Sequence, residues 1–396
     1  QFLWEHSSHA ITHQDNCNTS KSRVLLAWFQ REYELRQTKR MILNDLKTLV
    51  EIESPTEDLA ACTKVIQAAA TIAERVHGKT ARIITEEGRP VFWFGAEKPE
   101  IILLAHLDTV WPHGSYQPLW SLENDVIRGP GCFDMKAGFI QALYAMKDLA
   151  HDRIALIATS DEETGSATSK SLIQRLAKDA KAVLVLEATL DGKVKTGRKG
   201  TSMYQIAVHG RASHAGLEPE KGINATVEIA HLIKTIIELE SAAKGTTVVP
   251  TKLISGTTTN TVPALATLDI DARSFEMAEL ERIDSAIRQL KPIHPEAKIE
   301  ISGGINRPPL EERSTMALYE RFEKVVASLG RAPIGHAKVG GASDGNFAAA
   351  AGAPTLDGLG AVGAGAHALS EWVQASSVQE RADLLHAFLK DLLAHD

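Results

Sequence analysis

Short apolar runs alternate with helical patterns along the first large part of the chain. The strand-like runs are residues 91–95, 101–105, 153–159 and 182–188, and the helical patterns are residues 61–76 and 138–149. Apolar runs that are continuous rather than alternating are typical of strands buried on both faces, which occur mainly in parallel sheets. The pattern therefore predicts an α/β domain with a mixed, mostly parallel sheet flanked by helices.

The period of the pattern changes near residue 194. Residues 201–210 and 266–274 alternate apolar and polar side chains, as half-exposed antiparallel strands do, and an amphipathic helix lies between them. A second helix follows, with apolar side chains at steps of three and four residues at Met277, Leu280, Ile283, Ile287 and Leu290. With a strand over 297–302, the order β-α-β-β-α-β predicts a ferredoxin-like α+β domain inserted at residues 194–310.

The first kind of pattern returns after the insertion. Residues 316–329 have helical spacing, and an apolar run follows them. Ser377 followed by Glu380 has the spacing of a capping box, which predicts the start of the last helix. We therefore expect a discontinuous catalytic domain that comprises residues 41–193 and 311–396.

The first 40 residues differ from everything that follows. They are rich in His, Asn, Gln, Ser and Thr, and regular helical spacing begins only at Met41. We interpret residues 1–40 as an N-terminal extension of unknown role, and we expect its histidines to be solvated rather than to bind metal: His6, His9 and His13.

Composition narrows the expected partners. The 396 residues carry a net charge of -7, with 44% hydrophobic and 23% charged residues, which is ordinary for a two-domain globular chain. Clusters of Lys and Arg that would bind phosphate groups do not occur, so we expect neither nucleic acid nor a membrane as partner. Three scattered cysteines, Cys17, Cys62 and Cys132, exclude a disulfide framework and favour the cytoplasm, with a secreted or periplasmic location left open.

Six residues with metal-ligand chemistry stand at comparable places in the pattern. Those at the ends of predicted strands or just after them are His106, the pair Glu162 and Glu163, and Glu187. Asp134 lies in the segment GPGCFDMKAG just before a helix, and His367 lies in the Gly-rich segment GAVGAGAHA. In open α/β sheets, sites form outside the carboxyl ends of the strands. Mixed His and carboxylate ligands suit zinc, cobalt or manganese, so the sequence predicts a metal-dependent hydrolase.

Each candidate also has a simpler interpretation. Asp108 can orient the ring of the ligand His106, or His106 can be a buried histidine bonded to a neighbour. Asp134 can bridge two cations with its two oxygens, or it can be only a helix N-cap. Glu162 and Glu163 can form a solvated acidic turn, or one can bind metal while the other takes a proton from water. We predict Glu162 as the general base and Glu163 as a ligand.

Six segments of the chain resemble the motifs of one family of hydrolases. They are, in order, HLDTVWP, GPGCFDMKAG, TSDEETGS, GRASHAG, GGASDGNF and GAGAHA. They resemble the aminoacylase and glutamate carboxypeptidase family of dinuclear zinc hydrolases, which also holds acetylornithine deacetylase and succinyl-diaminopimelate desuccinylase. The resemblance covers about residue 41 to the C-terminus, and it implies two zinc ions per subunit with cobalt or manganese as substitutes.

The resemblance implies a role for each predicted ligand. His106 and Glu187 would bind one zinc ion, Glu163 and His367 would bind the other, and Asp134 would bridge the two, with a cis peptide bond after it. Five protein ligands are too many for one open tetrahedral zinc site, which normally takes three plus water. The number of ligands therefore also favours two ions.

The resemblance extends to the inserted domain. It implies that this domain is a lid that mediates homodimerisation, that His214 reaches a neighbouring active site to stabilise the oxyanion, and that Asn260 and Arg273 help to bind substrate. Arg273 can alternatively form a surface salt bridge within its own strand. The other residues that we assign to substrate binding are Gly341, Ser343 and Arg307, with Lys199 as a further candidate for a side-chain carboxylate.

The C-terminal motifs look most like the glutamate carboxypeptidase branch. We therefore expect release of a C-terminal amino acid, with glutamate as the candidate, from a small molecule or short peptide with a free C-terminal carboxylate. Alternatives are an N-acyl-amino-acid deacylase or a dipeptidase on the same scaffold, and a catalytically silent metal-binding scaffold. The silent scaffold is expected to lack the base or a ligand, and neither is missing. Phosphoryl transfer is disfavoured because no phosphate-binding GxxxxGK segment occurs.

Overall fold

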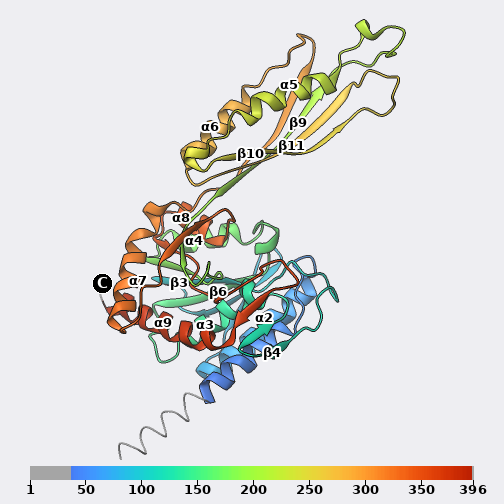
Figure 1. Ribbon diagram of the computed structural model, residues 1–396. Coiled ribbons are helices and arrows are strands. Elements are labelled where there is room, and N and C mark those ends of the chain that lie inside the picture. Colours follow the sequence, from blue (N-terminus) through green and yellow to red (C-terminus); the bar gives the residue numbers. More distant parts are fainter. Residues whose placement is uncertain (1–36, 395–396) are drawn as a thin grey trace, which may run out of the picture.

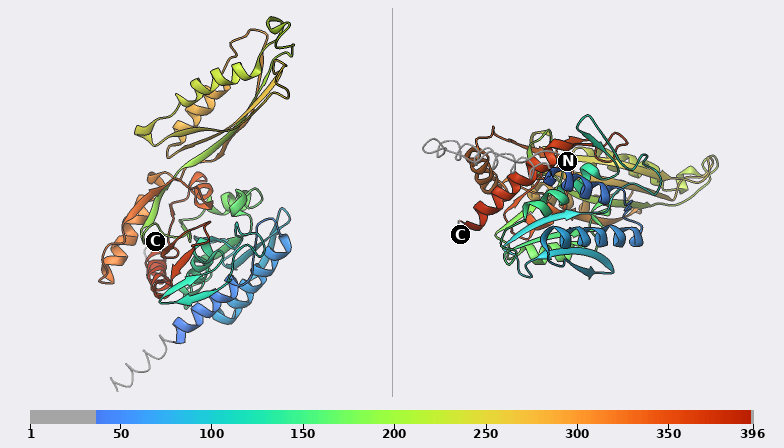
Figure 2. Two further views of the ribbon diagram at one scale, coloured as in Figure 1. Left: turned by 45° about the vertical axis from the view of Figure 1, so that its right-hand side comes forward. Right: turned by 90° about the horizontal axis from the view of Figure 1, so that it is seen from below.

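The computed structural model describes residues 37–394, which form two domains joined by a pair of adjacent chain segments (Figure 1). The inserted domain (residues 200–307) is elongated and projects from the larger domain in Figure 1 and in the left view of Figure 2. Residues 37–50 form a helix whose Leu46 and Leu49 are fully buried in the larger domain. Residues 1–36, with Cys17 and the histidines expected to be solvated, lie outside the described residues; these histidines are His6, His9 and His13.

A six-stranded sheet of order β1-β2-β6-β3-β7-β14 forms the centre of the larger domain. The strands are β1 (Arg82–Glu86), β2 (Arg89–Gly95), β3 (Ile101–His106), β6 (Ile154–Thr159), β7 (Ala182–Val185) and β14 (Thr355–Leu356). β6, β3, β7 and β14 run parallel, whereas the β1–β2 hairpin joins β6 in antiparallel orientation. The predicted mixed, mostly parallel sheet is confirmed. β1 is absent from the sequence prediction because it is a largely exposed edge strand.

Helices cover both faces of this sheet. Leu103 lies in the hydrophobic core between the sheet and α2, α3, α7 and α9. Leu104 lies in the hydrophobic core on the other face, against α4 and α8. The helices are α2 (Leu59–His77), α3 (Ala137–Ala145), α4 (Lys170–Ala177), α7 (Met316–Ser328), α8 (Asp344–Ala350) and α9 (Ala375–Ala394). Burial on both faces explains why these strands are continuous apolar runs. None of the helices in the described part of the chain is long and apolar enough to cross a membrane.

The inserted domain is an antiparallel sheet with two helices on one face. Its elements are β9 (Gly200–His209), α5 (Ala225–Ile237), β10 (Thr247–Ser255), β11 (Leu265–Ser274), α6 (Met277–Arg288) and β12 (Lys298–Arg307). The strand order is β10-β11-β9-β12, with every neighbouring pair antiparallel. Tyr204, Ile206 and Val208 lie in the core under the helices, whereas Met203 is exposed on the open face. The alternation of the sequence therefore reflects a sheet that is covered on one face.

The chain changes from one sheet to the other at residue 200 rather than at the predicted residue 194. β8 (Val194–Arg198) pairs in parallel with β13 (His336–Val339) of the larger domain. Gly200 then lies where the two connecting segments meet. A Cβ at Gly200 would lie 2.6 Å from the backbone N of Pro309 and 2.7 Å from the backbone O of Arg307, so a larger residue would push the segments apart.

A small second sheet joins distant segments of the larger domain. Its order is β15-β16-β5-β4, with β4 (Ser121–Glu123), β5 (Val126–Arg128), β15 (Gly363–Ala364) and β16 (Trp372–Gln374). Asp125, in the turn between β4 and β5, accepts hydrogen bonds from the backbone N and Oγ of Ser376 at 2.8 and 2.5 Å. α9 therefore begins at Ala375, and the predicted capping box at Ser377 is wrong. The Oγ of Ser377 instead donates to the backbone O of Gln374 at 2.7 Å.

Candidate metal centre

The carboxyl ends of the adjacent strands β6, β3 and β7 bring together side chains that are far apart in the sequence. The six residues come from the following elements: His106 ends β3, Glu162 and Glu163 form the turn after β6, Glu187 follows β7, Asp134 lies in the turn before α3, and His367 lies between β15 and β16. We call these six residues the cluster. Its position at the carboxyl edge of a sheet is where open α/β folds place their sites.

Asp134 lies between the two histidines of the cluster. Its Oδ1 is 3.5 Å from Nε2 of His106, and its Oδ2 is 3.3 Å from Nε2 of His367. Oε1 of Glu187 lies 3.8 Å from the same nitrogen of His106, and Oε2 of Glu163 lies 3.0 Å from that of His367. The cluster therefore consists of two His-carboxylate groups that share Asp134. The peptide bond from Asp134 to the next residue is cis, as the resemblance implies.

Asp108 is fully buried and connects His106 to the acidic turn. Nδ1 of His106 lies 3.1 Å from the backbone O of Asp108 and 3.5 Å from its Oδ1. The Asp108 carboxylate also accepts hydrogen bonds from Oγ1 of Thr56 at 2.7 Å and from the backbone N of Glu163 at 3.2 Å. Because Nδ1 faces Asp108, the ring turns Nε2 toward the other carboxylates. An orienting role for Asp108 requires this geometry.

The dense charge of the cluster shifts the pKa values of its members. Burial lowers the pKa of His106, but the nearby carboxylates of Asp108 and Asp134 outweigh this effect, and the pKa lies well above its ordinary value. Hydrogen bonds to Asp134 and to a second carboxylate raise the pKa of His367 to about 10. Burial raises the pKa of Glu162 to about 8. Without a cation, the cluster therefore holds protons that offset its negative charge.

The donor atoms of the cluster fit divalent cations. Nε2 of His106 is buried and has no hydrogen-bond partner among residues 37–394, which is unusual for a buried nitrogen and ordinary for a ligand atom. Ligand atoms of His106, Asp134 and Glu163 lie within 4.8 Å of one another, and His106 forms a second such group with Glu162 and Glu187. Imidazole nitrogens and carboxylate oxygens are ligands of zinc, cobalt and manganese. The residues therefore fit a metal centre of the predicted kind.

Comparison with known proteins agrees with this geometry. The profile of peptidase family M20/M25/M40 matches residues 102–391, which is most of the chain. The chain belongs to this family. Carboxypeptidase G2 of Pseudomonas sp. (strain RS-16) is 29% identical over 375 residues, which cover 89% of each chain. The predicted relationship and the prediction of a metallopeptidase-type hydrolase of peptide or amide bonds are confirmed.

Solved structures of other proteins share the fold. Aminopeptidase PepT from Bacillus cereus ATCC 10987 has a TM-score of 0.71 at 22% identity, with 90% of this chain and 99% of that chain covered. The YXEP protein of Bacillus subtilis, described as a dinuclear metal binding peptidase from the M20 family, has a TM-score of 0.65 at 13% identity and covers 91% of this chain and 99% of its own. The mixed α/β architecture is thus that of M20 peptidases.

Arg307, predicted to bind substrate, pairs with the predicted base of this M20 peptidase. Its Nη1 donates to Oε1 of Glu162 at 2.9 Å, and its Nη2 donates to Oγ of Ser166 at 3.0 Å. The guanidinium also lies 4.7 Å from the centre of the Phe347 ring, and the side chain is buried. Because Arg307 ends β12, this pair connects the last strand of the inserted domain directly to the cluster.

A buried arginine beside the cluster is absent from the sequence prediction. Arg198 approaches Oε2 of Glu187 to 3.2 Å and forms a two-bond pair with Asp357 at 2.8 and 3.0 Å. The backbone O of Gly341 accepts from Arg198 at 3.1 Å, and the Oγ of Ser343 donates to Asp357 at 2.6 Å. Both predicted substrate residues therefore belong to this network. Residues 194–198 gave no signal because they are buried although most of them are not apolar.

His214 and Asn260 lie in the inserted domain, away from the cluster. The backbone O of Asn260 accepts a hydrogen bond from the residue after His214 at 2.9 Å, so the two lie in neighbouring loops. The His214 loop follows the end of β9 at His209, and a strand of ten residues spans about 30 Å from the junction at Gly200. Within one chain, therefore, the structure does not bring His214 to the cluster.

Arg273 and Lys199 lie closer to the junction. Nε and Nη2 of Arg273 donate to the Asp271 carboxylate on the same strand at 2.8 and 3.0 Å, which is the alternative that the sequence leaves open. The amino group of Lys199 lies 5.6 Å from the centre of the Phe275 ring. Both basic side chains lie near the connecting segments. A movement of the inserted domain would therefore change their distance from the cluster.

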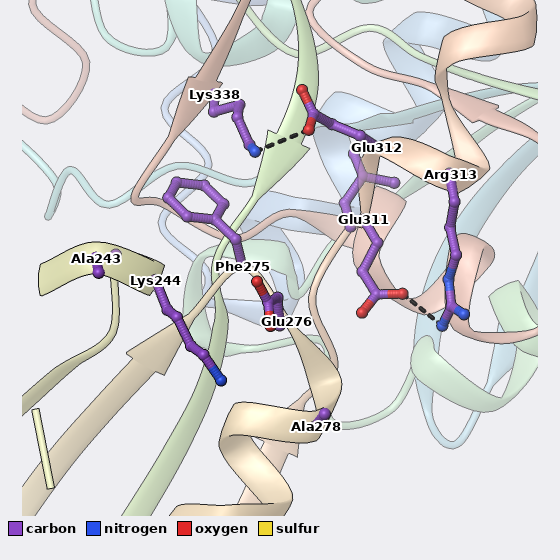
Figure 3. Close-up of a pocket in the computed structure, with 11 residues that line it drawn as sticks. Ala243, Lys244, Phe275, Glu276, Ala278, Glu311, Glu312, Arg313 and Lys338 are labelled. Carbon is purple, nitrogen blue, oxygen red and sulfur yellow. Dashed lines mark hydrogen bonds and ion pairs between the residues drawn. The ribbon is translucent and has the colours of Figure 1, made fainter. Parts of the chain in front are cut away.

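Two pockets of similar size differ in whether cluster residues line them. The one of about 580 Å³ opens at the junction between the domains, and no cluster residue is among those that line it (Figure 3). Four of its charged side chains form pairs, with Lys338 at 2.9 Å from Glu312 and Arg313 at 2.5 Å from Glu311. The other, of about 470 Å³, includes Glu163 in its lining. The second pocket therefore adjoins the metal centre.

Proposed function

We propose that this M20 peptidase is a dinuclear zinc hydrolase that releases a C-terminal amino acid, with glutamate as the candidate, from a short peptide or N-acyl amino acid. The observation that carries the proposal is the Asp134 carboxylate between two His-carboxylate groups, because one shared carboxylate suits two cations. The likeness to carboxypeptidase G2, at 29% identity, supports release of a C-terminal residue.

The cluster supplies the ligands for this chemistry. His106 and Glu187 would hold one cation, His367 and Glu163 the other, and Asp134 both. Two zinc ions, or cobalt or manganese in their place, would polarise the scissile carbonyl and lower the pKa of water. Asp108 would keep the ring of His106 in its ligand orientation.

Glu162 is placed to move the proton. It would take the proton from the attacking water and then deliver it to the leaving amine. In the cluster without cations, burial raises the pKa of its carboxyl group to about 8, so burial favours a group that holds a proton. Arg307, at 2.9 Å, would keep the carboxylate in place and favour its ionised form.

The inserted domain would complete the site in a homodimer. His214 lies too far from the cluster of its own chain, so it would stabilise the oxyanion in the site of a second copy, together with Asn260 at the substrate. For the free C-terminal carboxylate, Arg273 offers two donors once it leaves Asp271, and Lys199 offers a further cation for an acidic side chain. Gly341, Ser343 and Arg307 would support this site through the contacts described above.

The main alternative is an N-acyl-amino-acid deacylase or a dipeptidase that uses the same cluster. A panel of N-acyl amino acids and dipeptides that vary only in the C-terminal residue separates these activities, with zinc restored after chelation. We expect a preference in kcat/KM for acidic over neutral C-terminal residues. Equal rates would exclude the glutamate preference, and absence of hydrolysis in the whole panel would exclude the proposed function.

A further inference from the structure

Glu371 is a fully buried carboxylate that follows His367 and contacts the segment that carries Asp134. Its Oε1 accepts hydrogen bonds from the backbone N of Phe133 at 2.8 Å and of Asp134 at 3.1 Å. Its Oε2 accepts from the backbone N of Gly131 at 3.1 Å and from Nε1 of Trp111 at 3.2 Å. A carboxylate has about four acceptor positions, so these donors occupy Glu371 fully and leave no position for a cation.

The backbone of Glu371 is fixed as well. Its N donates to the O of Ala368 at 2.8 Å, and its O accepts from the hydroxyl of Tyr116 at 3.2 Å. The preceding carbonyl, of Ser370, accepts from Nη1 of Arg128 at 2.8 Å. One side chain with a fixed backbone thus connects the segment of His367 to the segment of Asp134, although more than half of the chain separates them.

The Asp134 segment needs such support because its own backbone is irregular. Asp134 has φ -115° and ψ 91°, and Met135 has φ -134° and ψ 32°, which are not helical values. The N–H groups before α3 therefore lack a regular helical ladder, and Glu371 accepts three of them. The same segment must present Oδ1 to His106 and Oδ2 to His367 at similar distances.

We propose that Glu371 is a positioning residue that holds the Asp134 carboxylate between the two histidines and thereby sets the affinity of the metal centre. The inference rests on the proposed function, because it assumes that Asp134 bridges two cations. Loss of a residue that orients a metal ligand typically lowers metal affinity or activity by about 10- to 100-fold.

The variant Glu371→Gln tests the proposal with little change of shape. The glutamine amide has one oxygen and one NH2 group. The two N–H groups that donate to the replaced oxygen would therefore face an NH2 group, which cannot accept from them. We expect cobalt affinity, measured by competition with a chelator, to fall by about 10- to 100-fold. We also expect the visible spectrum of the cobalt-loaded protein to change, because the geometry at the shared ligand changes.

Glu228→Gln is the matched control. Glu228 is a buried carboxylate of α5 that accepts from the backbone N of Ile293 at 2.7 Å and of His294 at 2.9 Å, in the inserted domain. The variant Glu228→Gln should lower the temperature of unfolding, whereas the cobalt affinity and the visible spectrum of the cobalt-loaded protein should stay at the wild-type values. Trp111→Phe removes one donor from Glu371 and provides a milder variant if Glu371→Gln does not fold. We expect it to weaken cobalt binding several-fold, in the same direction.

The outcomes separate this inference from the proposed function. If Glu371→Gln, or Trp111→Phe in its place, binds two cobalt ions with wild-type affinity and spectrum, Glu371 is only structural and the inference is overturned. If the wild-type protein itself does not bind two cations, the dinuclear proposal fails first. Weaker binding by Glu371→Gln but not by Glu228→Gln supports the positioning role.

Discussion

The cluster of the larger domain and the loops of the inserted domain differ in how they are built. The cluster residues are held by strand ends and by carboxylates such as Asp108, within one folded unit. His214 and Asn260 lie on loops about 30 Å along β9 from the junction. The difference teaches that the groups proposed for metal binding and proton transfer come together within one chain, whereas the proposed oxyanion stabilisation by His214 would require a second chain or a movement of the inserted domain.

Removal of the base gives the largest expected effect and tests the first half of this comparison. Glu162→Gln keeps the shape of the side chain but cannot take a proton, so kcat should fall by about 10²- to 10⁴-fold. Metal content, measured by elemental analysis, should stay at the wild-type value because Glu162 is not a proposed ligand. Glu97→Gln, at an exposed carboxylate, is the matched control and should leave kcat unchanged. Near-normal turnover by fully metallated Glu162→Gln would show that another group moves the proton.

Loss of His214 tests the second half. His214→Ala should lower kcat by about 10²- to 10³-fold, the cost of one oxyanion donor, without loss of metal. If His214 acts in a neighbouring copy, a co-expressed mixture of His214→Ala and Glu162→Gln chains should recover about a quarter of wild-type activity. Half of a random set of dimers then pairs the two variants, and one of the two sites in each such dimer is intact. Failure of the mixture to exceed its separate components would place His214 outside a shared site.

The comparison also explains what the sequence could predict. The runs at 101–105 and 153–159 predicted strands, and the polar residues that follow them, His106 and Glu162, predicted the edge at which the cluster lies. Such signals are local, because a strand buried on both faces leaves a continuous apolar run. The boundaries of the inserted domain were less well predicted, since β8 is buried but polar in sequence.

Contacts between distant segments left no local signal. α9 is capped by Asp125, which lies in another element, so the local pattern at Ser377 predicted the wrong start. The four donors to Glu371 come from segments more than 200 residues earlier in the chain, and no spacing around Glu371 indicates them. The roles proposed for Arg273 and His214 would depend on how two domains or two chains meet, which a single sequence does not specify.

A change in the inserted domain that leaves the cluster intact gives the smallest expected effect. Glu279 of α6 pairs with Nη2 of Arg282 at 2.8 Å and with Nζ of Lys244 at 2.6 Å. These hydrogen bonds lower its pKa from 4.5 to about 2. Because the pKa is lower in the folded protein, ionised Glu279 stabilises the fold above about pH 4.5, and this contribution is lost as the pH falls toward 2.

Glu279→Gln should therefore lower the free energy of unfolding by about 1 kcal/mol at pH 7, since its partners are partly exposed. Chemical denaturation of the metal-free protein should show that the difference from wild type shrinks below pH 4.5. Glu281→Gln, at an exposed position of the same helix, is the matched control and should have little effect at either pH. A difference that stays constant with pH would assign the loss to packing rather than to charge. Metal affinity should equal the wild-type value, because the cluster is built without α6.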